Sequence, residues 1–469
     1  MSKRTRTWVV ALTGIGSLMA ALDTLVVASA LSTIRLDLGA SVEQLEWTVN
    51  AYNLSFAVLL ITGAALGDRF GRRKLYALGL GLFALASAGC ALAPDVGVLV
   101  AFRAAQGAAA ALILPLALTL LTAAFPPEKR GVALGMFSAI TGIAVASGPL
   151  IGGAVVQGIA WQWIFWINVP IGLIAAPLAL AKMKEGYGRD TGLDIPGLAL
   201  VSAGVFGIVW GLVRGNSAGW GSTEVVASLA AGLALVAVFL AWQRRAREPM
   251  IPLQFFRSRA FSAGNASLFF LTASLFANVF FYSQLLQNVL GYDPLGTGLR
   301  LIPWTATFIT VAPVAGSFVN RIGERTLMVL GLTLQAAGTT WIALIADPSL
   351  PYSHLLAPLI MAGVGVSMAI PAAQTSVLGE LAEHDLGKAA GVNSMMRELG
   401  GVFGIAVVVA VFAGAGSYAS AQAFTDGFAP AIGVAAGLAA LGAVCGLGLP
   451  SRRTAVEHVG DLAIQEAGG

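Results

Sequence analysis

Long apolar stretches alternate with short polar ones along the whole chain of 469 residues. A helix that crosses the hydrocarbon core of a bilayer needs about 20 apolar residues, and fourteen stretches come close to that length or exceed it. They fall near residues 8–31, 46–66, 75–93, 98–123, 132–155, 163–181, 195–214, 224–243, 262–286, 296–319, 326–346, 354–378, 389–414 and 427–449. The pattern predicts an all-α membrane protein with fourteen spanning helices.

The positive charges indicate on which side of the membrane each connection lies. Cations cluster before the first stretch, at residues 3–6, and in even-numbered connections such as residues 69–74 and 182–189. Because cytoplasmic connections carry an excess of Lys and Arg, both termini are predicted in the cytoplasm, with the chain in the cytoplasmic membrane. A cleaved signal peptide ending near Ala30 is the competing interpretation, but its apolar run is long and contains Asp23.

The composition is that of a membrane protein that needs no resident cofactor. Hydrophobic residues make up 57% of the chain and charged residues 11%, against about 25% charged in soluble domains. The sequence has no GxxxxGK[ST] phosphate loop and its three histidines are scattered, so neither an ATP-driven pump, a membrane enzyme nor a metal site is expected. Cys90 and Cys445 lie inside apolar runs and are interpreted as inert core residues.

A polar octapeptide between the second and third stretches is the most specific motif. It reads Gly67-Asp68-Arg69-Phe70-Gly71-Arg72-Arg73-Lys74, and its glycines permit a tight turn. Residues 318–325, after the tenth stretch, repeat the pattern, with Arg321 matching Arg69 and Gly323 matching Gly71. The echo indicates two duplicated six-helix halves, which leaves two helices, near residues 194–243, between them.

The octapeptide resembles the signature loop of the major facilitator superfamily, and further motifs narrow the resemblance to its fourteen-helix drug:proton antiporters. Residues 22–31 are similar to the first-helix pattern of that family, and residues 103–107 to its arginine motif. Residues 148–153 resemble the motif of its antiporters, and residues 161–172 its entry to the sixth helix. The first helix departs from the family where three residues replace its threonine, asparagine and proline: Leu25, Ala28 and Ser32.

This resemblance implies the major facilitator fold, in which two six-helix bundles rock against each other, here with two extra central helices. We expect an N-terminal bundle at residues 1–185, the inserted helices within 186–250, a C-terminal bundle at 251–450 and a polar cytoplasmic tail at 451–469. The implied function is proton-coupled efflux of lipophilic drugs or antibiotics by alternating access. The alternatives are an exporter of one endogenous metabolite or antibiotic and a non-transporting sensor. The expected partners are the substrate, protons and the bilayer, with no nucleic acid.

Ionisable residues inside the apolar stretches are the candidates for proton coupling. Asp23 lies within the first stretch, and intramembrane carboxylates are costly enough to be functional by default. Burial favours the protonated form of a carboxyl group, and a nearby cation favours the ionised form. If Asp23 faces Arg103, these influences oppose each other, so Asp23 is expected to take up and release protons. The alternative is a static Asp23–Arg103 pair that only holds the helices together. Glu398 is the second candidate, for protons, substrate or a structural role. It follows Arg397, but adjacent helix positions diverge by about 100°, so the two side chains need not pair with each other: one can face the cavity and the other a neighbouring helix.

Two motifs are predicted to control the conformational change. The octapeptide is interpreted as a cytoplasmic latch, with Asp68 at the N terminus of the thirteenth helix and Arg72 or Arg73 bridging to Glu128; a purely topological role of its cations is the alternative. A proline inside the fifth helix bends it, and small residues allow close packing. The predicted latch comprises Asp68, Arg69, Gly71, Arg72, Arg73 and Glu128, and the predicted hinge Gly142, Gly148, Pro149, Gly152 and Gly153.

Aromatic, amide and charged side chains in the stretches are the candidates for substrate contact. They suit lipophilic, weakly polar compounds, including cations that bind ring faces, although aromatic residues also pack helices together. The scarcity of deep carboxylates disfavours a specialist for divalent cations. The candidates are Tyr52, Asn53, Phe56, Gln106, Phe137, Asn278, Tyr282, Trp304, Asn393 and Arg397.

Overall fold

The computed structural model describes residues 3–40, 42–188, 194–246, 253–378 and 386–451, and each regular element in these ranges is a helix. Thirteen segments are long and apolar enough to cross a membrane, and α5, with 32 residues, makes up the fourteen spans predicted from the sequence. In chain order the helices are α1 (Lys3–Leu38), α2 (Val42–Phe70), α3 (Arg72–Ala91), α4 (Val96–Ala124), α5 (Pro127–Gly158), α6 (Trp163–Trp166), α7 (Asn168–Lys182), α8 (Ile195–Ala218), α9 (Thr223–Gln243), η1 (Leu253–Arg257), α10 (Arg259–Gln284), η2 (Leu285–Val289), α11 (Pro294–Ile322), α12 (Glu324–Ile345), α13 (Ser353–Leu378), α14 (Leu386–Ala415) and α15 (Ala421–Gly446).

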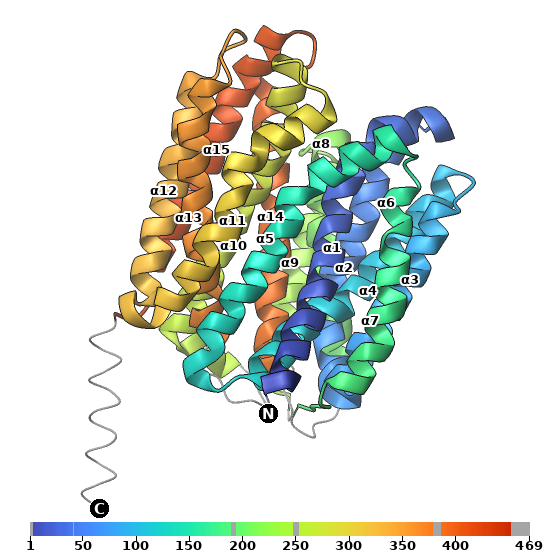
Figure 1. Cartoon of the computed structure of the whole chain (residues 1–469), viewed down its shortest axis with the longest axis vertical. Helices are drawn as coiled ribbons and strands as arrows, with labels where there is room; N and C mark the ends of the chain where they lie inside the picture. The colour runs from blue at the N-terminus through green and yellow to red at the C-terminus, as the bar shows by residue number, and fades with distance from the viewer. Residues whose placement is uncertain (1–2, 41, 189–193, 247–252, 379–385, 452–469) are drawn as a thin grey trace, which may run out of the picture.

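The helices form two bundles that stand side by side, α1–α7 and α10–α15 (Figure 1). In the first bundle α2 and α3 pack on α4, α1 packs on α5, and α3 packs on α7. The second bundle repeats these neighbours, because α11 and α12 pack on α13, α10 packs on α14, and α12 packs on α15. The two loop glycines correspond as well: Gly71 before α3 and Gly323 before α12 have φ angles of 108° and 92°. The duplicated plan predicted from the sequence echo is confirmed.

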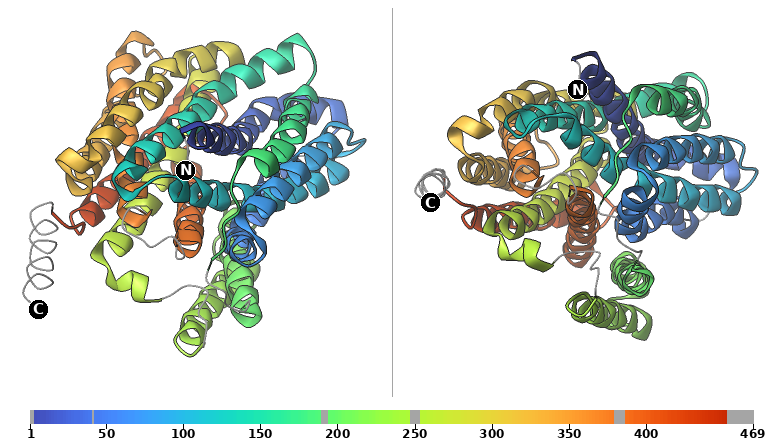
Figure 2. Two further views of the ribbon diagram at one scale, coloured as in Figure 1. Left: turned by 60° about the horizontal axis from the view of Figure 1, so that its bottom comes forward. Right: turned by 90° about the horizontal axis from the view of Figure 1, so that it is seen from below.

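The inserted helices α8 and α9 lie outside the two bundles, at one seam between them (Figure 2). α8 contacts α2 of the first bundle and α14 of the second, whereas α9 packs on α8. Glycines bring the pair together, since a Cβ added to Gly207 would lie 3.0 Å from the Cα of Gly232. At the other seam α5 packs along α11.

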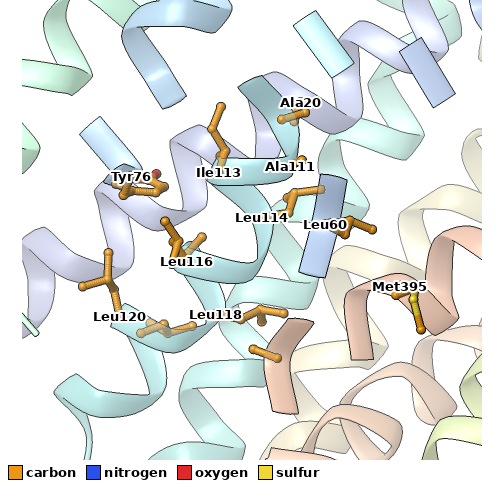
Figure 3. Packing of buried hydrophobic residues seen from close by; sticks show 14 of the residues in the cluster. Ala20, Leu60, Tyr76, Ala111, Ile113, Leu114, Leu116, Leu118, Leu120 and Met395 are labelled. Carbon is orange, nitrogen blue, oxygen red and sulfur yellow. The ribbon is translucent and has the colours of Figure 1, made fainter. Parts of the chain in front are cut away.

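One apolar cluster joins the two bundles at the face where α1 begins and α2 ends, here called the N-terminal face. It contains Leu60 and Leu118 of the first bundle together with Val392 and Met395 of α14 (Figure 3). The two other apolar clusters among the described residues each stay within a single bundle. The bundles are therefore sealed against each other by side chains at the N-terminal face.

Candidate functional site

A buried ion pair joins α1 to α4 in the first bundle. Asp23, 2% exposed, accepts a hydrogen bond from Nη1 of Arg103, which is 0% exposed. Two amides also donate to Oδ1 of the same carboxylate, Gln106 from 3.1 Å and Asn168 of α7 from 3.0 Å. Three donors from two helices thus surround Asp23, and the pairing with Arg103 that the sequence predicted is present.

Arg103 is held in place by groups from several helices. Its Nε donates to the carbonyl oxygen of Thr48 in α2 at 2.9 Å, and its Nη1 also donates to Oε1 of Gln106 at 2.8 Å. Its guanidinium carbon lies 4.5 Å from the ring centroid of Tyr52 and 5.9 Å from that of Phe165. Cation–π contacts of this kind are strongest where water is excluded. The orientation of Arg103 therefore depends on α2, α4 and α6 together.

Three uncharged members of this network, Ser87, Cys90 and Asn168, were not predicted. Gln106 donates to Oγ of Ser87 at 2.6 Å and accepts from Sγ of Cys90 at 3.2 Å, so α3 also contributes to the site. Cys90 was interpreted as an inert core residue, whereas its thiol takes part in the network. Asn168 lies in the segment at residues 161–172, and its position in an otherwise apolar helix was the available signal.

The octapeptide forms the turn between α2 and α3 at the N-terminal face. Gly71 has a φ of 108°, in the region that favours glycine, and Nε of Arg72 donates to Oδ1 of Asp68 at 2.7 Å. The segment after α7 runs beside this turn. The amide of Arg72 donates to the carbonyl of Gly186, and the amide of Gly188 to the carbonyl of Asp68, each at 2.9 Å. We call residues 183–188 the strap.

Glu185 is the side chain of the strap that binds the turn most directly. Its Oε1 accepts from the amide of Arg73 at 2.8 Å, and its Oε2 lies 3.4 Å from Nε of Arg73. Arg73 Nη1 also donates to the carbonyl oxygens of Leu180 and Met183. Glu185 was not among the predicted latch residues. The predicted partner Glu128 lies outside the residues whose side chains are described, and Arg69 is exposed at the N-terminal face.

Small residues line the contact between α5 and α11. Gly148, Gly152 and Gly153 are buried in α5, and a Cβ added to Gly135 of α5 would lie 3.2 Å from the Cα of Gly316 in α11. A Cβ added to Gly298 of α11 would lie 3.0 Å from the Cα of Leu150. The backbones therefore approach closely along this seam. The other two predicted hinge residues, Gly142 and Pro149, lie outside the described side chains.

Arg397 and Glu398 bind each other, although they occupy adjacent positions on α14. Nε and Nη2 of Arg397 approach Oε1 of Glu398 to 3.0 and 2.9 Å. Long side chains span the angle between adjacent positions, and an unpaired charge in a membrane is costly. Both side chains stay partly accessible, at 18% and 17%. Their neighbours Met396 and Leu399 pack against the apolar cluster that joins the two bundles, and α14 contacts α2, which places the pair beside the interface between the bundles.

The remaining substrate candidates fall into separate groups. Tyr52 and Phe56 lie together in α2, with ring centroids 5.8 Å apart; Asn53 is half-buried and Phe137 of α5 is buried. In the core of the second bundle, Asn278 and Tyr282 donate to Oγ1 of Thr339, and Trp304 packs edge-on against Tyr282. A hollow of about 500 Å³ lies between α2, α3 and α4, and its lining is apolar and includes none of these candidates.

Comparisons with known proteins identify the group to which these features point. The family model of the Major Facilitator Superfamily matches residues 13–405. The tetracenomycin C resistance and export protein of Streptomyces glaucescens is 36% identical over 397 residues, which cover 84% of this chain and 73% of that protein. The puromycin resistance protein pur8 of Streptomyces alboniger is 32% identical over 466 residues, 96% of this chain and 92% of that protein. The solved structure of the proton:xylose symporter XylE has a TM-score of 0.68 at 15% identity, covering 95% of each chain, and shares the fold.

Proposed function

This chain belongs to the major facilitator superfamily, and from that premise we propose that it exports lipophilic drugs or antibiotics across the cytoplasmic membrane in exchange for protons. The chain is a multi-pass membrane transporter whose similar proteins are antibiotic resistance and export proteins. We propose that the N-terminal face is cytoplasmic, because the cations cluster there, that the two bundles occupy residues 1–185 and 251–450, and that residues 451–469 are a cytoplasmic tail.

The observation that carries the proton coupling is the buried network around Asp23. A proton on Asp23 removes the carboxylate charge, so the ion pair with Arg103 becomes a hydrogen bond between the cationic guanidinium and a neutral carboxyl group, which is weaker. The attachment of α1 to α4 therefore loosens when Asp23 is protonated and tightens when the proton leaves. α1 packs on α5, and α5 packs along α11 of the second bundle. A change at Asp23 thus has a contiguous path to the interface between the bundles.

The apolar seal at the N-terminal face supports alternating access. In the described state Leu60, Leu118 and Met395 belong to one apolar cluster that spans the interface, so the bundles are closed against each other at the N-terminal face. With that face in the cytoplasm, we propose that a substrate site between the bundles opens to the outside in this state. Loading from the cytoplasm requires this seal to separate. The turn at Gly71 and the strap with Glu185 lie at the same face, and we propose that they hold α2 and α3 in position during the opening. The glycine-lined contact of α5 with α11 is the proposed hinge.

The test is drug uptake into inside-out vesicles under an imposed pH gradient, with puromycin and ethidium as probes. The wild-type protein is expected to concentrate at least one probe when the gradient is applied. Asp23→Asn removes the ionisable carboxyl but keeps a similar shape, and gradient-driven uptake is expected to fall by about tenfold or more.

Asp347→Asn is the matched control, because Asp347 lies in the loop before α13 and binds only Ser349 among the described residues. It is expected to behave like the wild type. Driven uptake that survives in Asp23→Asn at equal expression would contradict the assignment of Asp23 as the coupling residue. Absence of driven uptake in the wild type would contradict proton-coupled drug export itself.

A further inference from the structure

α14 presents two opposite charges side by side at the interface between the bundles. Both guanidinium nitrogens of Arg397 that take part in the pair approach the same oxygen, Oε1 of Glu398. None of the interactions among the described residues engages Oε2 of Glu398. Because each side chain is still 17–18% exposed, the pair is accessible to a ligand between the bundles without unfolding of α14.

The net charge of this pair restricts what can bind to it. The pair has no net charge, so a lipophilic monocation that binds Glu398 leaves an excess positive charge at the site, and a lipophilic anion that binds Arg397 leaves an excess negative charge. Either event leaves one charge in a poorly hydrated place without a partner of opposite sign, which is unfavourable. A molecule with both a cationic and an anionic group offers a partner to each side chain. It exchanges one ion pair for two and leaves no charge uncompensated.

Polar groups one helical turn away complete a binding surface. Asn393 and Ser394 precede Arg397 and Glu398 by four positions, so they lie on the same sides of α14. Nδ2 of Asn393 and Oγ of Ser394 are buried, and neither has a hydrogen-bond partner among the described residues. A buried polar group without a partner is costly, so a movement of the bundles that brings these two groups to a ligand held by the charged pair supplies the missing partners.

We propose that Arg397 and Glu398, together with Asn393 and Ser394, form a dipolar substrate subsite that selects lipophilic zwitterions over lipophilic monocations and anions of similar size. The inference rests on the proposed export function, of which it specifies the substrate class. Its test is a binding measurement that needs no proton gradient, so the two proposals can fail separately.

The experiment measures fluorescence polarisation of three dyes with the purified full-length protein in detergent. The dyes are rhodamine B, a zwitterion at neutral pH, its ethyl ester, a cation with the same ring system, and fluorescein, an anion. Wild-type protein is expected to bind rhodamine B about tenfold more tightly than either of the others, which corresponds to about 1.4 kcal/mol. Arg397→Gln is expected to shift the preference toward the ester, and Glu398→Gln toward fluorescein.

Two further variants separate recognition from folding. Exchanging the charges, with Arg397→Glu and Glu398→Arg together, keeps a pair on α14 and is expected to retain the preference for rhodamine B. Arg300→Gln is the control, because Arg300 lies in α11 against the rings of Tyr292 and Tyr352, and it is expected to leave the ratios unchanged. Equal binding of rhodamine B and its ester by the wild type, or no binding of rhodamine B, would overturn the proposal. So would single variants that weaken all three dyes by the same factor, because a purely structural pair predicts that result.

Discussion

At the scale of single residues, Asp23 and Arg103 depend on each other for their burial. Arg103 is fully buried and Asp23 nearly so, and each supplies the charge that makes the other tolerable in a membrane. Removing one partner of a buried pair leaves an uncompensated charge and costs about 3–5 kcal/mol, whereas removing both charges is far less harmful. The pair is thus a structural contact between α1 and α4, and one added proton is enough to end the charge compensation between its two members.

This dependence predicts that the losses of stability in variants of Asp23 and Arg103 are strongly non-additive. Arg103→Gln is expected to lower the free energy of unfolding by about 3 kcal/mol, because Asp23 is left without its cation. Adding Asp23→Asn to that variant is expected to restore most of the stability while coupling stays lost. Thermal unfolding of the single and double variants in detergent measures both effects. Additive losses would indicate that the two charges do not interact in the folded protein.

Some residues of the site can be recognised from the sequence alone. A charged residue inside an apolar stretch is rare, so Asp23, Arg103 and Glu398 stand out without any structure. Ser87 and Asn168 do not, because uncharged polar residues occur in membrane helices for many reasons. The pairing of Arg397 with Glu398 could not be predicted, since helical geometry fixes the direction of the Cβ atoms and not where long side chains end.

At the scale of elements, the turn between α2 and α3 combines a positive φ angle at Gly71 with close packing against Glu185 of the strap. Gly71 has a φ of 108°, and a Cβ added there would lie 2.9 Å from Cδ of Glu185. The turn motif was recognisable from the sequence because glycine and charge patterns are local. Its partner Glu185 was not, because 112 positions separate it from Arg73 and only the folded chain brings the strap to the turn.

A pair of glycine substitutions in the same region tests this arrangement. Gly71→Ala is expected to destabilise the protein by about 1–3 kcal/mol and to reduce drug export, because it strains the backbone and pushes against Glu185. Gly81→Ala, in α3, is the control, since nothing lies within 4 Å of the added Cβ and alanine favours a helix. Export assays and thermal unfolding at equal expression compare the two. A Gly71→Ala protein as stable and active as the control would contradict a tight turn held by the strap.

At the scale of the whole molecule, two similar bundles meet along seams of different character. The α5–α11 seam brings backbones together through glycines, whereas the N-terminal face is closed by larger apolar side chains. The sequence predicted the number of helices and their duplicated order, because apolar length and charge position are properties of each segment. It did not predict which face is closed or that α8 lies between α2 and α14, since both depend on contacts between distant segments.

A disulfide across the closed N-terminal face is expected to block export reversibly. A Cβ added to Gly391 of α14 would lie 3.0 Å from Cβ of Ala64 in α2, so a separation of the two helices by less than about 1 Å brings the pair to the Cβ–Cβ distance of a disulfide, about 3.5–4.5 Å. Ala64→Cys combined with Gly391→Cys, in a protein without Cys90 and Cys445, is expected to form a disulfide on oxidation that stops export and to regain export on reduction. Each single cysteine variant is the control. Undiminished export by the fully cross-linked protein would show that the seal need not open.

If export is driven by protonation and deprotonation of Asp23, binding of a drug is expected to displace the proton from that residue. The most direct measurement is the proton release that follows addition of puromycin to the purified, weakly buffered protein, followed with a pH-indicating dye. Wild-type protein is expected to release protons and Asp23→Asn to release none, with puromycin binding itself retained in the variant. Equal proton release by both proteins would contradict this expectation and assign the coupling to another residue.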